Sequence, residues 1–118
     1  MSFKKSHPIT IDGKQYMLKY NINSIIDLES KISTKNMTKL IQSYPFSHTD
    51  AVACLYVGLQ EDIPSITPKK ALRLVEKWLE ANTMTELCDV LLMALAKAGA
   101  IGKMSLYDET EADEAGKK

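Results

Sequence analysis

The stretch PITIDGKQYMLKY, residues 8–20, decides the fold class because its pattern is that of two strands joined by a tight turn. Apolar and polar residues alternate over residues 8–11, and the extended pattern resumes over residues 15–20. Asp12-Gly13 between them favours a two-residue type I′ turn. The side chains expected to share one face of the hairpin are Ile9, Ile11, Tyr16, Leu18 and Tyr20. A lone hairpin is marginally stable in water, so this face must pack on the rest of the chain.

The apolar spacing becomes helical after Tyr20, and capping and breaking signals divide the rest of the chain into about five helices. The expected boundary signals are, in chain order, Asn23 as the first cap, a short helix over roughly 36–43 ended by Pro45, the cap Ser47, the start Thr67-Pro68, the capping box Thr83/Glu86, and the end of the last helix at Lys97 and Gly99. The sequence therefore predicts an α+β fold that is mostly α-helical: an N-terminal β-hairpin followed by a compact bundle of about five helices.

Length and charge predict one domain with two disordered ends. A chain of 118 residues, 45% of them hydrophobic, suits a single core. We expect this domain over residues 8–103, after a disordered N-terminus at residues 1–7. Residues 104–118 hold five acidic residues against two lysines, a net charge of −3, with few large apolar side chains. We expect an acidic disordered tail there, because such a stretch cannot bury enough surface to order itself.

Composition narrows the class of protein. The formal net charge is zero, so no overall field draws the chain to nucleic acid or to a membrane. Two cysteines, Cys54 and Cys88, are too few for the disulfide framework of a small secreted domain. The longest apolar run, residues 90–96, is far shorter than the ~20 residues of a membrane span. No apolar segment typical of a signal peptide follows the first lysines. We expect a soluble, intracellular protein.

The residue types that carry enzyme chemistry are scattered along the chain. His7 is expected in the N-terminal tail and His48 at a helix start, with no other ligand at metal-binding spacing near either. Cys54 and Cys88 lie on apolar helix faces, which favours buried thiols over a nucleophile. The glycines are isolated and form no phosphate-binding loop. We therefore expect no catalytic site, no metal site and no cofactor.

A basic stripe on the fourth helix leaves a nucleic-acid alternative open. Lys69, Arg73 and Lys77 stand at i, i+4 and i+8. Glutamates interleave with them, and Arg73 is the one arginine of the chain, so an ordinary solvated face is the simpler interpretation. A small DNA-binding or regulatory protein using this stripe remains the alternative from another functional class.

The last helix is apolar on almost every side. From Leu87 the chain reads LCDVLLMALAKAGAIG, with Asp89 as the single charge before Lys97. Such a helix must be buried over most of its surface. Two interpretations remain open: a central helix wrapped by the others, or a helix that docks on another chain through a face containing Leu92, Met93 and Ala96.

Several segments together carry a family resemblance. They are, in chain order, IIDLESKI (residues 25–32), LYVGL (55–59), the acidic pair Glu61-Asp62 and the helix start Ile66-Thr67. With the N-terminal β segment and the final apolar helix, this order resembles phage tail assembly chaperones of the siphophage and gene-transfer-agent type, found in prophages of Gram-positive bacteria. The resemblance covers roughly residues 8–101. The chain departs from the family pattern in a later proline, at residue 64, and in its long acidic tail.

The resemblance implies a non-enzymatic function in virion assembly. Such chaperones bind the long helical tape measure protein, keep its apolar segments from aggregating and help recruit the tail tube protein. They act in the host cytoplasm and are absent from the mature virion. The family also makes a longer product by a programmed −1 frameshift, and Gly116-Lys117-Lys118 would permit one if encoded by GGA-AAA-AAG. The implied partners are therefore the tape measure protein, the tail tube protein and the frameshifted longer form, with no nucleic acid and no membrane; a homo-oligomer is also compatible.

The resemblance assigns no binding residues, so our candidates come from the apolar pattern alone. The expected partner-binding residues are Tyr56, Leu59, Trp78, Leu92 and Met93. Each could instead belong to the core, and an Asp substitution separates the two roles. A structural tail component is a further alternative, which would be found in purified virions.

Overall fold

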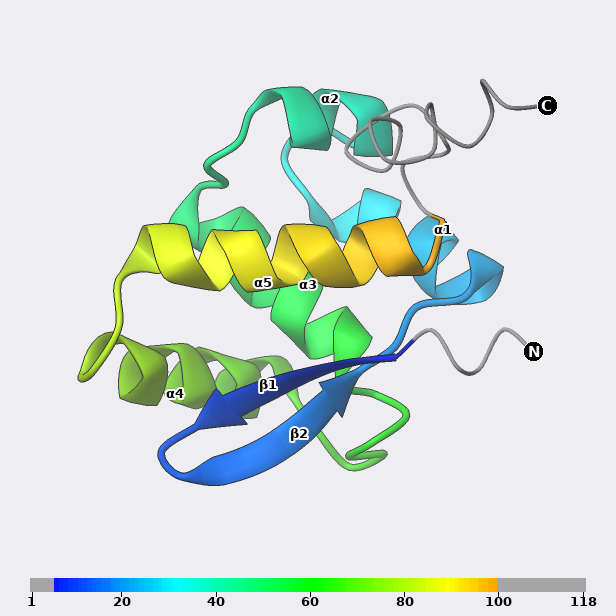
Figure 1. Ribbon diagram of the computed structural model, residues 1–118. Helices are drawn as coiled ribbons and strands as arrows, with labels where there is room; N and C mark the ends of the chain where they lie inside the picture. Colours follow the sequence, from blue (N-terminus) through cyan, green and yellow to red (C-terminus); the bar gives the residue numbers. More distant parts are fainter. Residues whose placement is uncertain (1–5, 100–118) are drawn as a thin grey trace, which may run out of the picture.

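The computed structural model describes residues 6–99 and shows an antiparallel β-hairpin followed by five helices (Figure 1). The elements are β1 (His7–Ile11), β2 (Lys14–Leu18), α1 (Ile22–Lys31), α2 (Met37–Gln42), α3 (His48–Gly58), α4 (Pro68–Leu79) and α5 (Met84–Lys97). The predicted α+β class is confirmed. The disorder predicted for residues 1–5 and 104–118 falls outside the described residues.

The hairpin has the predicted turn. Ile11 pairs with Lys14, and the two residues between them, Asp12 and Gly13, have φ of 54° and 80°. Positive φ at both positions is the type I′ geometry, which matches the twist of the flanking strands. The hairpin begins one residue earlier than predicted, because His7 pairs with Leu18. The prediction of a disordered His7 is therefore wrong.

The hairpin packs its apolar face on three helices. Ile9, Ile11, Leu18 and Tyr20 are buried, and Tyr16 is half-buried, as the alternation predicts. β1 lies against α4 and α5, whereas β2 lies against α3. This contact supplies the support that a two-stranded sheet lacks on its own.

The central helix is α3. It contacts α1, α4, α5 and β2, and from Ala51 to Leu59 it has buried side chains around most of its circumference. In Figure 1, α3 runs behind α5. α5 buries Leu87, Leu91 and Leu95 but leaves Met93 exposed. The interpretation of α5 as the helix wrapped by all the others is therefore wrong, because α3 occupies that position.

Most of the predicted caps are present. Ser47, Thr67 and Thr83 each accept a hydrogen bond from a backbone N–H three residues ahead, and the capping box of α5 is complete. α5 is followed by Gly99, whose φ of +79° suits the residue after a helix. The cap of α1 is Asn21, not Asn23: its Oδ1 accepts from Ser24 N–H at 2.9 Å. Tyr20 is already anchored in the core, so the chain turns into the helix directly after it.

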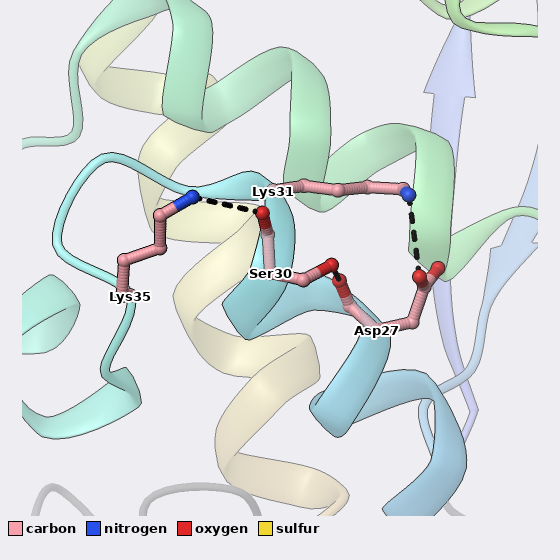
Figure 2. Close-up of polar contacts among 4 residues, drawn as sticks. All are labelled: Asp27, Ser30, Lys31 and Lys35. Carbon is pink, nitrogen blue, oxygen red and sulfur yellow. Dashed lines mark hydrogen bonds and ion pairs between the residues drawn. The ribbon is translucent and has the colours of Figure 1, made fainter.

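Polar side chains complete the end of α1 (Figure 2). Lys35 Nζ donates to the Ser30 carbonyl at 3.0 Å, and Ser30 Oγ donates to the Asp27 carbonyl at 2.7 Å. Lys31 forms an ion pair with Asp27 at 3.2 Å. Two carbonyl groups near the helix end thus gain donors from neighbouring side chains.

A buried carboxylate joins α1 to α3. Asp50 is 2% exposed and accepts hydrogen bonds from Ser33 N–H at 2.9 Å and Ser33 Oγ at 2.8 Å. Asp50 also takes part in the predicted Ser47 cap, since its own N–H donates to Ser47 Oγ at 3.1 Å. Its carboxylate instead holds the turn between α1 and α2, a contact that local spacing does not reveal.

Candidate functional site

Two of the five predicted partner-binding residues belong to the core. Leu59, at the end of α3, has no exposed surface. Trp78 is 7% exposed, and its Nε1 donates to the Thr83 carbonyl at 2.9 Å. Trp78 therefore fixes the turn between α4 and α5, since Thr83 is the cap of α5. Both residues therefore have core positions, the alternative that the sequence left open for each candidate, and the small exposed part of Trp78 lines a groove beside β1.

The other three candidates lie nearer the surface but on different helices. Tyr56 is half-buried on α3, with Lys31 Nζ 5.9 Å from its ring centroid. Leu92 is half-buried and Met93 is 45% exposed, both on α5. Ala96, expected on the same docking face, is buried. The surface of α5 around Met93 thus remains a candidate interface. Tyr56 is not part of it, because its ring lies near Lys31 of α1.

An open groove lies beside this part of α5. It has a volume of about 470 Å³ and is formed by Pro8, Ile9, Thr10, Trp78, Ala81 and Val90, with polar residues at its margin. We call it the β1–α5 groove. Val90 is half-buried and precedes Met93 by three residues, so the two side chains are neighbours along one side of α5. The groove was not predicted, because it exists only where the hairpin meets the α4–α5 turn.

A second groove lies between the hairpin and α4. Its volume is about 370 Å³, and four cationic side chains line it: Lys14, Lys70, Arg73 and Lys77. We call it the basic groove. The predicted stripe of Lys69, Arg73 and Lys77 is exposed, as expected. Lys70, and not Lys69, lines the groove beside Arg73 and Lys77. The hairpin adds Lys14, a fourth cation that the spacing along α4 cannot predict.

The thiols are buried, as predicted. Cys54 and Cys88 are both 0% exposed, and burial raises the pKa of each. Raised pKa values keep the thiols protonated and unreactive at neutral pH. Within residues 6–99, no three metal-ligating side chains come together.

His7 differs from the solvated residue that was expected. It is half-buried, and its Nδ1 is buried with no hydrogen-bond partner. Burial lowers the pKa of His7, and the nearby positive charge of Lys97 lowers it further. The surroundings of His7 in β1 therefore disfavour its protonated form through burial and through the charge of Lys97, which lowers its pKa.

None of the helices described in residues 6–99 combines the length and apolar character needed to cross a membrane. Compared with known proteins, the chain matches no protein-family model, no curated protein and no solved structure.

Proposed function

We propose that this protein is a non-enzymatic tail assembly chaperone, which binds an apolar helical segment of the tape measure protein while the tail tube is assembled. The family resemblance of residues 8–101 motivates the proposal. The observation that supports it best is the exposed Met93 on α5, three residues after Val90, which lines the β1–α5 groove.

The physical case rests on the combination of concave shape and apolar side chains. Val90 and Trp78 form part of the groove wall. Met93 is exposed on α5, where Val90 is its neighbour at i−3 and the charged residues Asp89 and Lys97 are its neighbours at i−4 and i+4. Grooves of this kind receive the apolar face of a partner helix. Methionine suits such a surface because its flexible, polarizable side chain adapts to different partner side chains.

Other large apolar side chains are exposed outside this groove. Ile22 and Ile26 are neighbours one turn apart on α1, and Leu72 and Leu79 lie on α4. None of these four lines the β1–α5 groove. Leu72, as exposed as Met93, therefore offers a control position.

The proposal is tested by co-purification with the tape measure protein, taken as the long helical protein encoded next to this gene. Met93→Asp should weaken binding at least tenfold, which corresponds to about 1.4 kcal/mol. Leu72→Asp, at an equally exposed position outside the groove, should bind as the unaltered protein does. Far-UV circular dichroism should be unchanged in both variants. Equal binding by Met93→Asp and the unaltered protein would refute the assignment of this surface.

The basic groove favours a second candidate function, a small DNA-binding or regulatory protein. Lys14 joins Lys70, Arg73 and Lys77 there, so the cationic surface is larger than the sequence stripe indicated. Binding through these four cations would weaken steeply with salt, with a slope of about −0.9 per neutralised phosphate in a log–log plot. Retention on DNA that collapses as salt rises, together with failure to bind the tape measure protein, would favour this candidate. Recovery from purified virions would instead favour a structural tail component.

A further inference from the structure

The basic groove has an excess of positive charge, and its cations form no ion pair within residues 6–99. Four cations and one carboxylate, that of Asp12, line the groove, so its lining has a net charge of +3. The ion pairs found within residues 6–99 join Lys19 to Glu61 and Lys31 to Asp27, so none of the four groove cations has a carboxylate partner there. Lys14 instead lies 5.3 Å from the ring centroid of Tyr16.

The groove also has an apolar floor. Tyr16 and Leu74, both half-buried, line it together with the cations. A floor of this kind beside several cations suits an extended acidic peptide, because the backbone and small side chains lie on the apolar surface while carboxylates reach the ammonium and guanidinium groups. Arg73 adds a planar fork of donors that matches a carboxylate.

The same chain contains a segment with the complementary charge. Residues 108–114 read DETEADE, five carboxylates in seven residues, and we call them the acidic segment. We propose that the acidic segment docks in the basic groove of its own chain and covers it. The proposal is independent of the client proposed for the β1–α5 groove.

A short connection joins the acidic segment to α5. From Gly99 to Asp108 the chain has nine residues, which span about 30 Å when fully extended. This reach is about two thirds of the longest dimension of the structure, 45 Å. Tethering also raises the effective concentration of the segment at the groove to the millimolar range. Weak, salt-screened charge pairs can therefore give a populated contact within one chain.

Docking of the acidic segment would compete with other polyanions for the groove. The cations that would hold phosphates are the same ones that would hold the carboxylates of residues 108–114. Nucleic acid should therefore bind more tightly when these carboxylates are removed.

Paramagnetic relaxation in the full chain tests the contact. A spin label attached through Ala112→Cys reports the position of the acidic segment, while Cys54 and Cys88 stay unlabelled because they are 0% exposed. At low salt the backbone amides of residues 14–16 and 70–77 should lose most of their intensity. At 1 M salt, where the Debye length is about 3 Å, the intensity should return.

Charge reversal provides the matched control. Arg73→Glu should restore the groove signals, whereas Lys39→Glu should not, although it changes the net charge by the same amount. Lys39 is on α2, at the opposite end of the molecule from the hairpin and α4 (Figure 1). Broadening spread evenly over the domain, or confined to another face, would overturn the proposal. The second test compares the affinity of a DNA duplex for the unaltered chain with its affinity for a variant that has amides at all five acidic positions. Equal affinities would also overturn the proposal.

Discussion

At the scale of single residues, Gly58 is required by close packing rather than by backbone conformation. Its φ is not positive, unlike that of Gly13 and Gly99. A Cβ built on it would lie 2.5 Å from Tyr20 Oη and 2.8 Å from Leu18 Cδ2. Tyr20 cannot retreat easily, because its hydroxyl donates to the Cys54 carbonyl at 2.6 Å. The glycine of the LYVGL segment therefore lets the hairpin approach α3.

Gly58→Ala should lower the free energy of unfolding by about 1–3 kcal/mol, the usual cost of overpacking a core. Helix propensity alone predicts the opposite sign, because alanine is favoured over glycine by about 1 kcal/mol inside a helix. The free energy of unfolding, measured in urea, distinguishes the overpacking effect from the propensity effect. A variant as stable as the unaltered protein, or more so, would show that the contact relaxes without cost.

His7 should make stability depend on pH. Its pKa in the folded protein is lowered from 6.5, so the unfolded chain binds a proton more readily. The stabilising contribution is therefore fully present above pH 6.5 and is lost as the pH falls through the lower, folded-state pKa. The urea midpoint should fall over this range, and His7→Gln should reduce the fall. His48→Gln, at an exposed position, should leave it unchanged; if instead it removes the dependence, His7 is not its source.

At the scale of elements, the Asp50 carboxylate connects the turn after α1 to α3. Asp50→Asn should lower the free energy of unfolding by about 1.5–3 kcal/mol, because it removes the charge from two hydrogen bonds with Ser33. Ser33→Ala, which removes the hydroxyl contact alone, should cost less. Hydrogen exchange at Ser33 N–H should accelerate more in Asp50→Asn than in Ser33→Ala, because this N–H donates to the Asp50 carboxylate. Equal stability of both variants with the unaltered protein would contradict this role.

The sequence predicts the turns and caps of the elements better than it predicts which elements pack against one another. The type I′ turn and the caps Ser47, Thr67 and Thr83 were predicted because each depends on residues only a few positions apart. The cap of α1 was misplaced by two residues, because a distant contact of Tyr20 fixes where the helix begins.

The candidate sites were predicted less well than the elements, for the same reason. The apolar pattern identified α5 as a helix with few polar positions but could not show that α3, rather than α5, contacts most of the other elements. It left open whether Trp78 lies in the core or binds a partner, and the bond from its Nε1 to the Thr83 carbonyl is a contact that periodicity does not reveal. It found Arg73 and Lys77 on α4, but not Lys14, which the hairpin brings to them.

At the scale of the whole molecule, the position of the hairpin on the helices creates two different surfaces. On one side, β1 forms the largely apolar β1–α5 groove with the α4–α5 turn. On the other, the hairpin forms the basic groove with α4. Asp12 borders both grooves, so the type I′ turn positions the rim that they share. In our account the apolar groove receives a client helix and the basic groove receives the acidic segment.

The central claim is that this protein shields apolar segments of the tape measure protein, and light scattering of that protein after dilution from denaturant tests it most directly. We expect an equimolar amount of the unaltered chain to suppress aggregation and Met93→Asp to fail, with Leu72→Asp as effective as the unaltered chain. Aggregation of the tape measure protein to the same extent with and without this chain would contradict the account.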